Sequence, residues 1–149
     1  MNEIKLKRVE KHDKLLIYSW FNELENIKLK IKTKHKISIR EHNIWFNKML
    51  NSKKKKFWLI ITKNKIAGQI RLDLIDKDIF EVDIFIIKNL RGLNIASNGL
   101  ALAEKKLKKG SAIISTVKKN NKRSLVFFKN CNYHIFFENR ILWKLKKVV

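Results

Sequence analysis

Arg91-Gly92-Leu93-Asn94-Ile95-Ala96 stands between an apolar run at 80–87 and a segment at 97–109 that has the spacing of an amphipathic helix. Backbone N–H groups at a helix start have no intrahelical partners, and the helix dipole adds partial positive charge there. A strand that leads through small residues into a helix is therefore typical of an anion site. We interpret this stretch as a turn that can hold a pyrophosphate.

The segments before this turn show strand and helix patterns. We expect a short strand at 3–9, and Asp13 can cap the helix that follows. That helix would place Leu16, Trp20 and Leu24 on one face at four-residue spacing. Residues 26–37 alternate lysine with apolar side chains, so this region is either a strand or an extended loop.

A second helix and a hairpin come next. Ser38-Ile39-Arg40-Glu41 is a capping box, which predicts a helix that carries an apolar stripe and ends at Asn51-Ser52. Two β-rich runs, 57–62 and 65–72, meet at Lys63-Asn64 and indicate a hairpin, in which Gly68 marks a bulge.

The C-terminal half also mixes the two kinds of element. Residues 79–87 are apolar enough for a central strand, and we expect a helix from 94 to 109 that stops at Gly110. A buried strand at 112–117, a helix at 121–130 and a hairpin of 133–137 with 140–146 complete the chain. The prediction is one mixed α/β domain that spans residues 1–149.

Charge and composition limit the partners. The net charge is +22, but lysine supplies 29 of the 35 basic residues and is scattered along the chain. Nucleic-acid surfaces favour arginine, so we interpret the charge as a general solvated surface that attracts anionic ligands. The single Cys131 and the four histidines have no metal-ligand spacing, so no metal is expected. No apolar run is long enough to span a membrane, and the expected location is cytoplasmic.

Two motifs resemble the GNAT superfamily of acetyl-coenzyme A (acetyl-CoA) dependent N-acetyltransferases. In that family the turn reads Arg or Gln, two residues, Gly, one residue, then Gly or Ala, which here are Arg91, Asn94 and Ala96. Asn94 replaces the usual glycine and tolerates a left-handed backbone better than most residues. The second motif begins at Asn121 and continues through Ser124, Phe128 and Asn132-Tyr133.

The resemblance implies a fold, a reaction and a set of cofactor contacts. The implied fold is a mostly antiparallel, bent sheet of about seven strands with four helices, which opens as a V between strands 4 and 5. Acetyl-CoA would be the co-substrate, and its pantetheine would bind the free backbone of the strand before the turn. The implied cofactor-binding residues are Ile84, Phe85, Ile86, Arg91, Gly92, Leu93, Asn94, Ile95, Ala96, Ser97, Asn121 and Phe128.

A narrower resemblance concerns the acceptor. Trp20-Phe21-Asn22, the His42 helix with Trp45-Phe46, and residues 68–73 look like the branch that acetylates the 4-amino group of nucleotide-linked deoxy sugars, as in pseudaminic-acid synthesis. The rival is a protein or peptide N-terminal acetyltransferase of the ribosomal-protein type. Alternatives of other classes are a basic nucleic-acid binding module and a CoA binder without turnover. The expected assembly is a monomer or a homodimer.

Three residues are candidates for proton transfer, and each has a purely structural alternative. Glu81 precedes the thioester-binding stretch and could serve as base, or it could be a solvated or lysine-paired carboxylate. His42 could take a proton near neutral pH, or it could be core. Many family members have a tyrosine acid where this chain has Phe128, so the resemblance implies another acid, such as Tyr133, or water, or none.

Five residues are the candidates for acceptor binding: Arg71, Asp73, Trp20, Asn22 and His42. Arg71 could bind a diphosphate while Asp73 holds a sugar hydroxyl or the amine, since the two share one strand face. They could equally bind each other. Trp20 is more consistent with a core position than with a platform for base stacking.

Overall fold

A single seven-stranded sheet in the order β1-β2-β3-β4-β5-β7-β6 organises the computed structural model, which describes residues 3–29 and 35–149. Every neighbouring pair is antiparallel except β4 and β5, which are parallel. The strands are β1 (Ile4–Arg8), β2 (Lys55–Thr62), β3 (Lys65–Asp76), β4 (Ile79–Ile86), β5 (Ala112–Lys118), β6 (His134–Glu138) and β7 (Leu142–Val148). The helices are η1 (Lys11–Asp13), α1 (Lys14–Phe21), α2 (Leu24–Leu29), α3 (Ile39–Asn51), η2 (Lys88–Leu90), α4 (Ile95–Lys105) and α5 (Lys122–Asn130).

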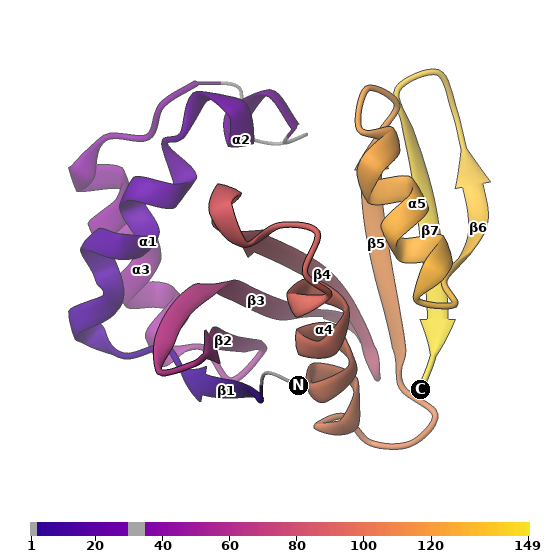
Figure 1. The fold of residues 1–149 in the computed structure, drawn as a ribbon, viewed down its shortest axis with the longest axis horizontal. Coiled ribbons are helices and arrows are strands. Elements are labelled where there is room, and N and C mark those ends of the chain that lie inside the picture. The colour runs from indigo at the N-terminus through magenta and orange to yellow at the C-terminus, as the bar shows by residue number, and fades with distance from the viewer. Residues whose placement is uncertain (1–2, 30–34) are drawn as a thin grey trace.

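The sheet divides into two arms that diverge between β4 and β5 (Figure 1). β1 to β4 form one arm, with α4 packed on one face and α1 and α3 on the other. β5, β7, β6 and α5 form the second arm. The predicted bent sheet with a V between strands 4 and 5 is therefore confirmed, as are four longer helices, to which α2 adds a short fifth.

Local signals in the sequence explain where helix α3 starts and how β2 turns into β3. Ser38 caps α3, because its hydroxyl oxygen accepts the Glu41 N–H at 3.1 Å. Lys63 and Asn64 both have positive φ, 51° and 61°, which suits the two-residue turn that joins β2 to β3. The predicted bulge lies beside Gly68. There the β2–β3 register shifts between Ile60, which is opposite Gly68, and Ile61.

Three local expectations differ from the structure. Residues 26–29 belong to helix α2 (Leu24–Leu29) rather than to a strand or loop, and residues 30–34 of that prediction lie outside the described residues. The Asp13 carboxylate accepts the Glu10 N–H at 2.8 Å and so stabilises η1 instead of the α1 start. Helix α4 ends at Lys105, before the predicted residue 109, and Gly110, whose N–H donates to the Val149 carbonyl at 2.7 Å, belongs to the turn before β5.

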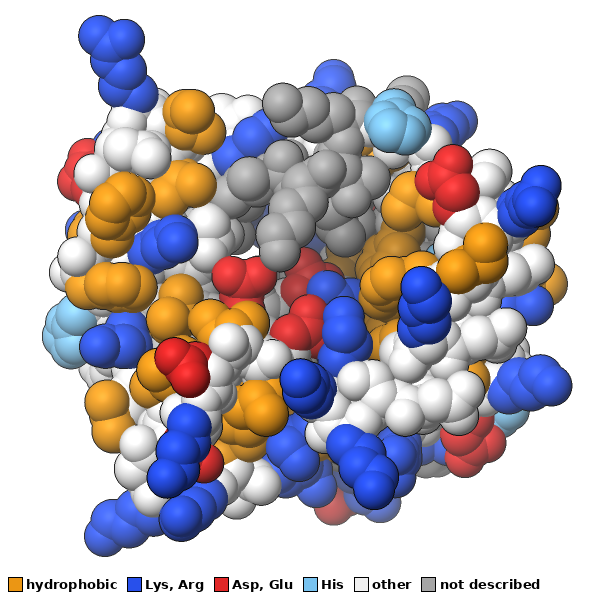
Figure 2. Space-filling model, turned by 180° about the vertical axis from the view of Figure 1, so that it is seen from behind, with side chains coloured by type: hydrophobic (Ala, Val, Ile, Leu, Met, Phe, Trp, Pro, Cys, Tyr) orange, Lys and Arg blue, Asp and Glu red, His pale blue; other side chains and the backbone are white. Residues whose placement is uncertain are grey.

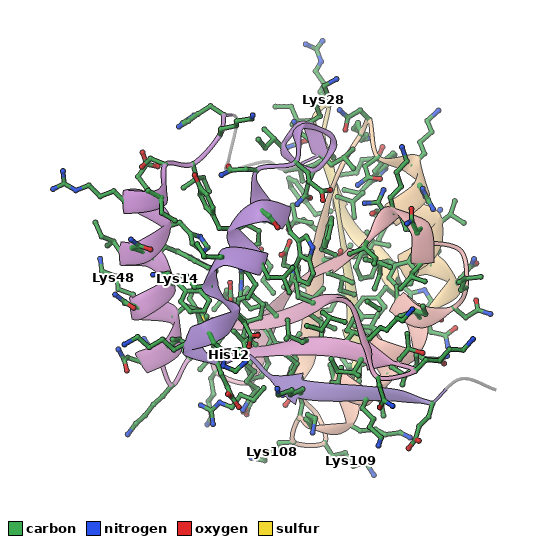
Figure 3. The ribbon with its side chains drawn as sticks, turned by 60° about the vertical axis from the view of Figure 1, so that its left-hand side comes forward. His12, Lys14, Lys28, Lys48, Lys108 and Lys109 are labelled. Atoms are coloured by element: carbon green, nitrogen blue, oxygen red, sulfur yellow. The ribbon has the colours of Figure 1, made fainter. Side chains whose placement is uncertain are left out.

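The positive charge is not concentrated on one element. Lys14 lies on helix α1, Lys48 on α3 and Lys28 in the last turn of α2. Lys108 and Lys109 lie at the end of the molecule opposite Lys28 (Figure 3). This distribution agrees with a general solvated surface.

Candidate active site

A cavity of about 740 Å³ lies where the two arms separate. β4 and β5 are paired from Ile79, opposite Ala112, as far as Glu81, opposite Ile114. Among the described residues, β4 has no β5 partner beyond Glu81, although it continues along β3 to Ile86. The β5 side of residues 84–86 therefore borders the cavity, and the binding of pantetheine to this backbone stays a prediction.

The turn before α4 forms the next wall of this cavity. Asn94 adopts the expected left-handed conformation, with φ 62° and ψ 15°, and Gly92 has φ 78°. The Arg91 Nε donates to the Ile86 carbonyl at 2.9 Å, which ties the turn to the end of β4. The free N–H groups of the first α4 turn lie beside this loop, so the site suits an anion.

Helix α5 supplies the opposite wall. Asn121 caps it, with its Oδ1 accepting the Ser124 N–H at 3.2 Å. Phe128 is 6% exposed, borders the cavity and packs against Tyr133 at a ring-centroid distance of 5.2 Å. Of the twelve residues predicted to bind acetyl-CoA, eleven line this one cavity; Leu93, which is 59% exposed, does not.

The cavity also contains residues that sequence reasoning missed. Asn26 and Leu29 come from α2, which the sequence pattern did not identify as a helix. Ser115 and Thr116 come from β5, and Arg123 and Phe127 belong to α5. The last two are four residues apart, and this helical spacing after Asn121 was a usable signal.

Polar and charged side chains share one face of β3 and β4. Arg71 lies opposite Asp83 and Asp73 lies opposite Glu81, so the two-residue period places all four on this face. The Arg71 Nε donates to both Asp73 oxygens, at 3.0 and 3.2 Å, and Lys55 lies 3.7 Å from Asp73. Arg71 and Asp73 thus bind each other, which was the structural alternative for this pair.

Aromatic rings hold Arg71 in place. Its guanidinium carbon lies 5.3 Å from the centroid of Trp45 and 5.6 Å from that of Phe57, distances typical of cation–π contacts. A diphosphate at Arg71 would have to compete with Asp73 for the guanidinium.

His42 lies in an aromatic cluster of α1 and α3 and not on the cavity wall. It is 1% exposed, and its ring contacts Tyr18, Phe21, Trp45 and Phe46. The Lys14 carbonyl lies 2.9 Å from Nε2, and because a carbonyl only accepts, Nε2 carries a proton. Burial lowers the pKa of His42 below its ordinary value. Its predicted role in proton transfer stays a prediction.

Tyr133 lies behind Phe128 and is not among the described residues that line the cavity. It is 1% exposed, and its hydroxyl donates to Glu104 at 2.9 Å, while Lys147 donates to the other Glu104 oxygen at 2.9 Å. Burial and the Glu104 charge raise the pKa of Tyr133 far above its ordinary value. A role as general acid, which stays a prediction, would require this hydroxyl to leave Glu104.

The two remaining acceptor candidates have structural partners. Trp20 is 5% exposed and packs on Phe85 at 5.2 Å between ring centroids. The Asn22 side chain binds the backbone of Ile37 through both its oxygen and its nitrogen, at 2.7 and 2.9 Å. Asn22 therefore joins the end of α1 to the segment before α3.

Residues 17–133 match the family model described as "Acetyltransferase (GNAT) family". The chain belongs to this family. GNAT acetyltransferases use acetyl-CoA as co-substrate, so this protein is an acetyl-CoA dependent acetyltransferase. The free edge of β4, the left-handed turn at Asn94 and the start of α4 fit a thioester with a pyrophosphate.

Solved structures share this GNAT fold over nearly the whole chain. One is a domain from Methanocaldococcus jannaschii, with 20% identity, 100% coverage of both chains and a TM-score of 0.88. Another is spermidine N-acetyltransferase from Vibrio cholerae with CoA and spermine, with 16% identity, 97% and 95% coverage and a TM-score of 0.81. A third is N-acetyltransferase PseH from Campylobacter jejuni with acetyl-CoA, with 22% identity, 98% and 99% coverage and a TM-score of 0.75. None of the curated proteins matches the chain in sequence.

Within residues 3–29 and 35–149, no group of three or more His, Cys, Asp or Glu side chains is placed to hold a metal ion. No helix in these ranges has the length and apolar character needed to cross a membrane.

Proposed function

We propose that this acetyltransferase modifies a primary amine, and that the amine belongs to a nucleotide-linked amino-deoxy sugar. The observation that carries the amine chemistry is the cavity between the arms, in which residues 84–86 of β4 lie beside the Asp83 carboxylate. In this proposal the α4 N-terminus binds the pyrophosphate, and residues 84–86 orient the thioester and polarise its carbonyl. Asn121 and Phe128 contribute the α5 side of the same site.

Three observations support the nucleotide sugar. The sequence elements at 20–22, 38–46 and 68–73 resemble those of sugar-nucleotide acetyltransferases, and PseH shares the fold. Two arginines, Arg91 and Arg123, line the cavity and could bind a second diphosphate. The net charge of +22 draws anionic substrates toward the protein.

A cationic acceptor, such as a polyamine or a peptide N-terminus, is the second candidate. The shared face of β2, β3 and β4 carries three carboxylates, Asp73, Glu81 and Asp83, against two cations, Arg71 of β3 and Lys55 of β2. Its net charge is thus −1, in a chain whose total is +22. Acidic side chains also gather near the centre of one molecular face, with basic side chains to their right and below them (Figure 2). Such a local excess attracts ammonium groups.

A thiol-release assay with acetyl-CoA separates these candidates. The amines are a UDP-4-amino sugar, spermidine and a short peptide, and the proposal expects the highest kcat/KM for the sugar. Arg123→Gln should lower kcat/KM for the sugar at least tenfold, whereas the exposed control Arg140→Gln should not. Release with spermidine or peptide alone would overturn the sugar assignment. Stabilisation by acetyl-CoA without release for any amine would identify a binder without turnover.

A further inference from the structure

Arg71, Asp73, Glu81 and Asp83 share one face of β3 and β4, which we call the acceptor face. The two carboxylates of β4 on this face, Glu81 and Asp83, differ in their relation to β5. Glu81 is the last β4 residue paired with β5, and its Oε2 lies 3.4 Å from the hydroxyl of Thr116 on that strand. Asp83 is the next residue on the same face, and it is the first residue of that face beyond the pairing. Asp83 lines the cavity beside Ile84 and Phe85, whereas Glu81 is not among the described lining residues.

Gln69 orients Asp83 from the adjacent strand. It is 0% exposed and lies on β3 between Leu59 of β2 and Phe85 of β4. Its Nε2 donates to the Asp83 Oδ2 at 3.0 Å, while its Oε1 has no hydrogen-bond donor among the described residues. A fully buried acceptor without a donor is unfavourable.

We infer that Asp83, positioned by Gln69, receives the proton of the acceptor ammonium. This inference rests on the proposed amine acetylation and names the base of that reaction. The carboxylate takes one proton from R–NH3+, and the neutral amine attacks the thioester carbonyl carbon. The C–N bond forms, the C–S bond breaks, and the nitrogen gives up its second proton to water. The thiolate leaves and takes up one proton from solvent. Asp83 then returns its proton to water.

Asp83 differs in position from the other titratable groups around it, because it lies both on the acceptor face and on the cavity wall. The acceptor face also carries Arg71, which is the cross-strand partner of Asp83, and Asp73 and Glu81. The cavity wall also carries Arg91 and Arg123. Asp83 is the carboxylate that combines this wall with the acceptor face. It adjoins residues 84–86, where the thioester carbonyl would be polarised.

Asp83→Asn and Glu81→Gln form a matched pair of isosteric substitutions. We expect Asp83→Asn to lower kcat roughly 100-fold or more. Its kcat/KM should rise steadily with pH as the amine in solution loses its own proton, while its affinity for acetyl-CoA stays unchanged. Glu81→Gln should keep the wild-type pH profile within a few-fold. The reverse pattern, or wild-type profiles in both variants, would overturn the inference.

Gln69→Met tests the positioning role, because methionine has nearly the same length but no amide. A carboxylate that loses an N–H donor holds its proton more tightly, so the acidic limb of kcat/KM should move to higher pH. A purely structural role would lower the melting temperature without moving that limb, and that result would contradict the assignment of Gln69. Binding of acetyl-CoA shows that the variant is folded.

A second readout separates this inference from the proposed function. If wild-type protein acetylates no amine of the panel, the proposed function fails, and spermidine serves as the probe of the amine site. Spermidine should raise the melting temperature of the acetyl-CoA complex in wild type and Glu81→Gln but not in Asp83→Asn. An equal rise in all three proteins, or no rise in wild type, would overturn the role of Asp83.

Discussion

Replacing Gly68 with alanine should disturb both the sheet and the acetyl-CoA site. Gly68 lies on β3 opposite Ile86, and a Cβ built on it would lie 1.9 Å from the carbonyl oxygen of Phe85. That oxygen belongs to the backbone, so no side-chain rotation can relieve the contact. The two strands must move apart, and the β4 residues that move border the cavity.

The size of the effect follows from this contact. The strands must separate by about 1.1 Å to reach 3.0 Å, and ladder hydrogen bonds of about 2.9 Å do not survive such a stretch. Two lost bonds at about 1 kcal/mol each, with the strain of one extra methyl group, lower the free energy of unfolding by about 3–4 kcal/mol. Displacement of residues 85–86 should weaken acetyl-CoA binding about tenfold, which corresponds to about 1.4 kcal/mol.

Urea denaturation and isothermal titration calorimetry measure these two quantities. Gly99→Ala is the matched control, because its Cβ would meet Cδ1 of Ile60 at 2.9 Å, the end of a side chain that can rotate. The control should lose only about 1 kcal/mol and keep its affinity for acetyl-CoA. The reasoning is refuted if Gly68→Ala loses no more stability than the control or binds acetyl-CoA as wild type does.

Three further predictions concern single side chains. Asn94→Ala should lower the free energy of unfolding by about 1 kcal/mol, because alanine tolerates φ 62° poorly; in urea denaturation, a loss no larger than that of the exposed Asn98→Ala would contradict this. Tyr133→Phe should lose about 1 kcal/mol with its Glu104 hydrogen bond but keep kcat in the thiol-release assay; a hundredfold fall in kcat would instead support Tyr133 as general acid. Burial lowers the pKa of His42, so the unfolded chain binds that proton more tightly, and the unfolding free energy should fall as pH drops below about 6.5. His42→Gln should flatten this fall in denaturation series at several pH values, whereas the exposed His12→Gln should not; an unchanged slope in His42→Gln would contradict the assignment.

Elements with local signals could be predicted from the sequence. The turn at Lys63-Asn64 and the cap at Ser38 depend on residues that are neighbours in the chain. Helix α2 lacks such a signal, because residues 26–31 alternate lysine with apolar side chains as a strand would. Tertiary contacts decide it: Asn26 donates to the Trp20 carbonyl at 2.9 Å, and Ile27 is buried at 8% exposure. Packing thus overrode the local pattern.

The difference between local signals and tertiary contacts also divides the residues of the site into two groups. The pyrophosphate turn and the Asn121 cap are contiguous motifs, so their residues could be placed on one cavity from the sequence. The α2 and β5 contributions depend on which elements border the opening between the arms. Lys118 of β5 donates to the Lys28 carbonyl at the end of α2 at 3.2 Å, which brings the two arms together across that opening. No spacing within either segment predicts such a contact.

The choice between Glu81 and Asp83 shows where sequence reasoning ends at this site. A period of two places both carboxylates on one face of β4, and by that criterion they are equivalent. The difference between them comes from β5, which pairs with Glu81 and diverges before Asp83. β5 lies about thirty residues later in the chain, beyond a helix, and parallel register over such a separation depends on how the helix packs. One long-range register thus decides which carboxylate borders the cavity, and the Asp83→Asn and Glu81→Gln pair measures its consequence directly.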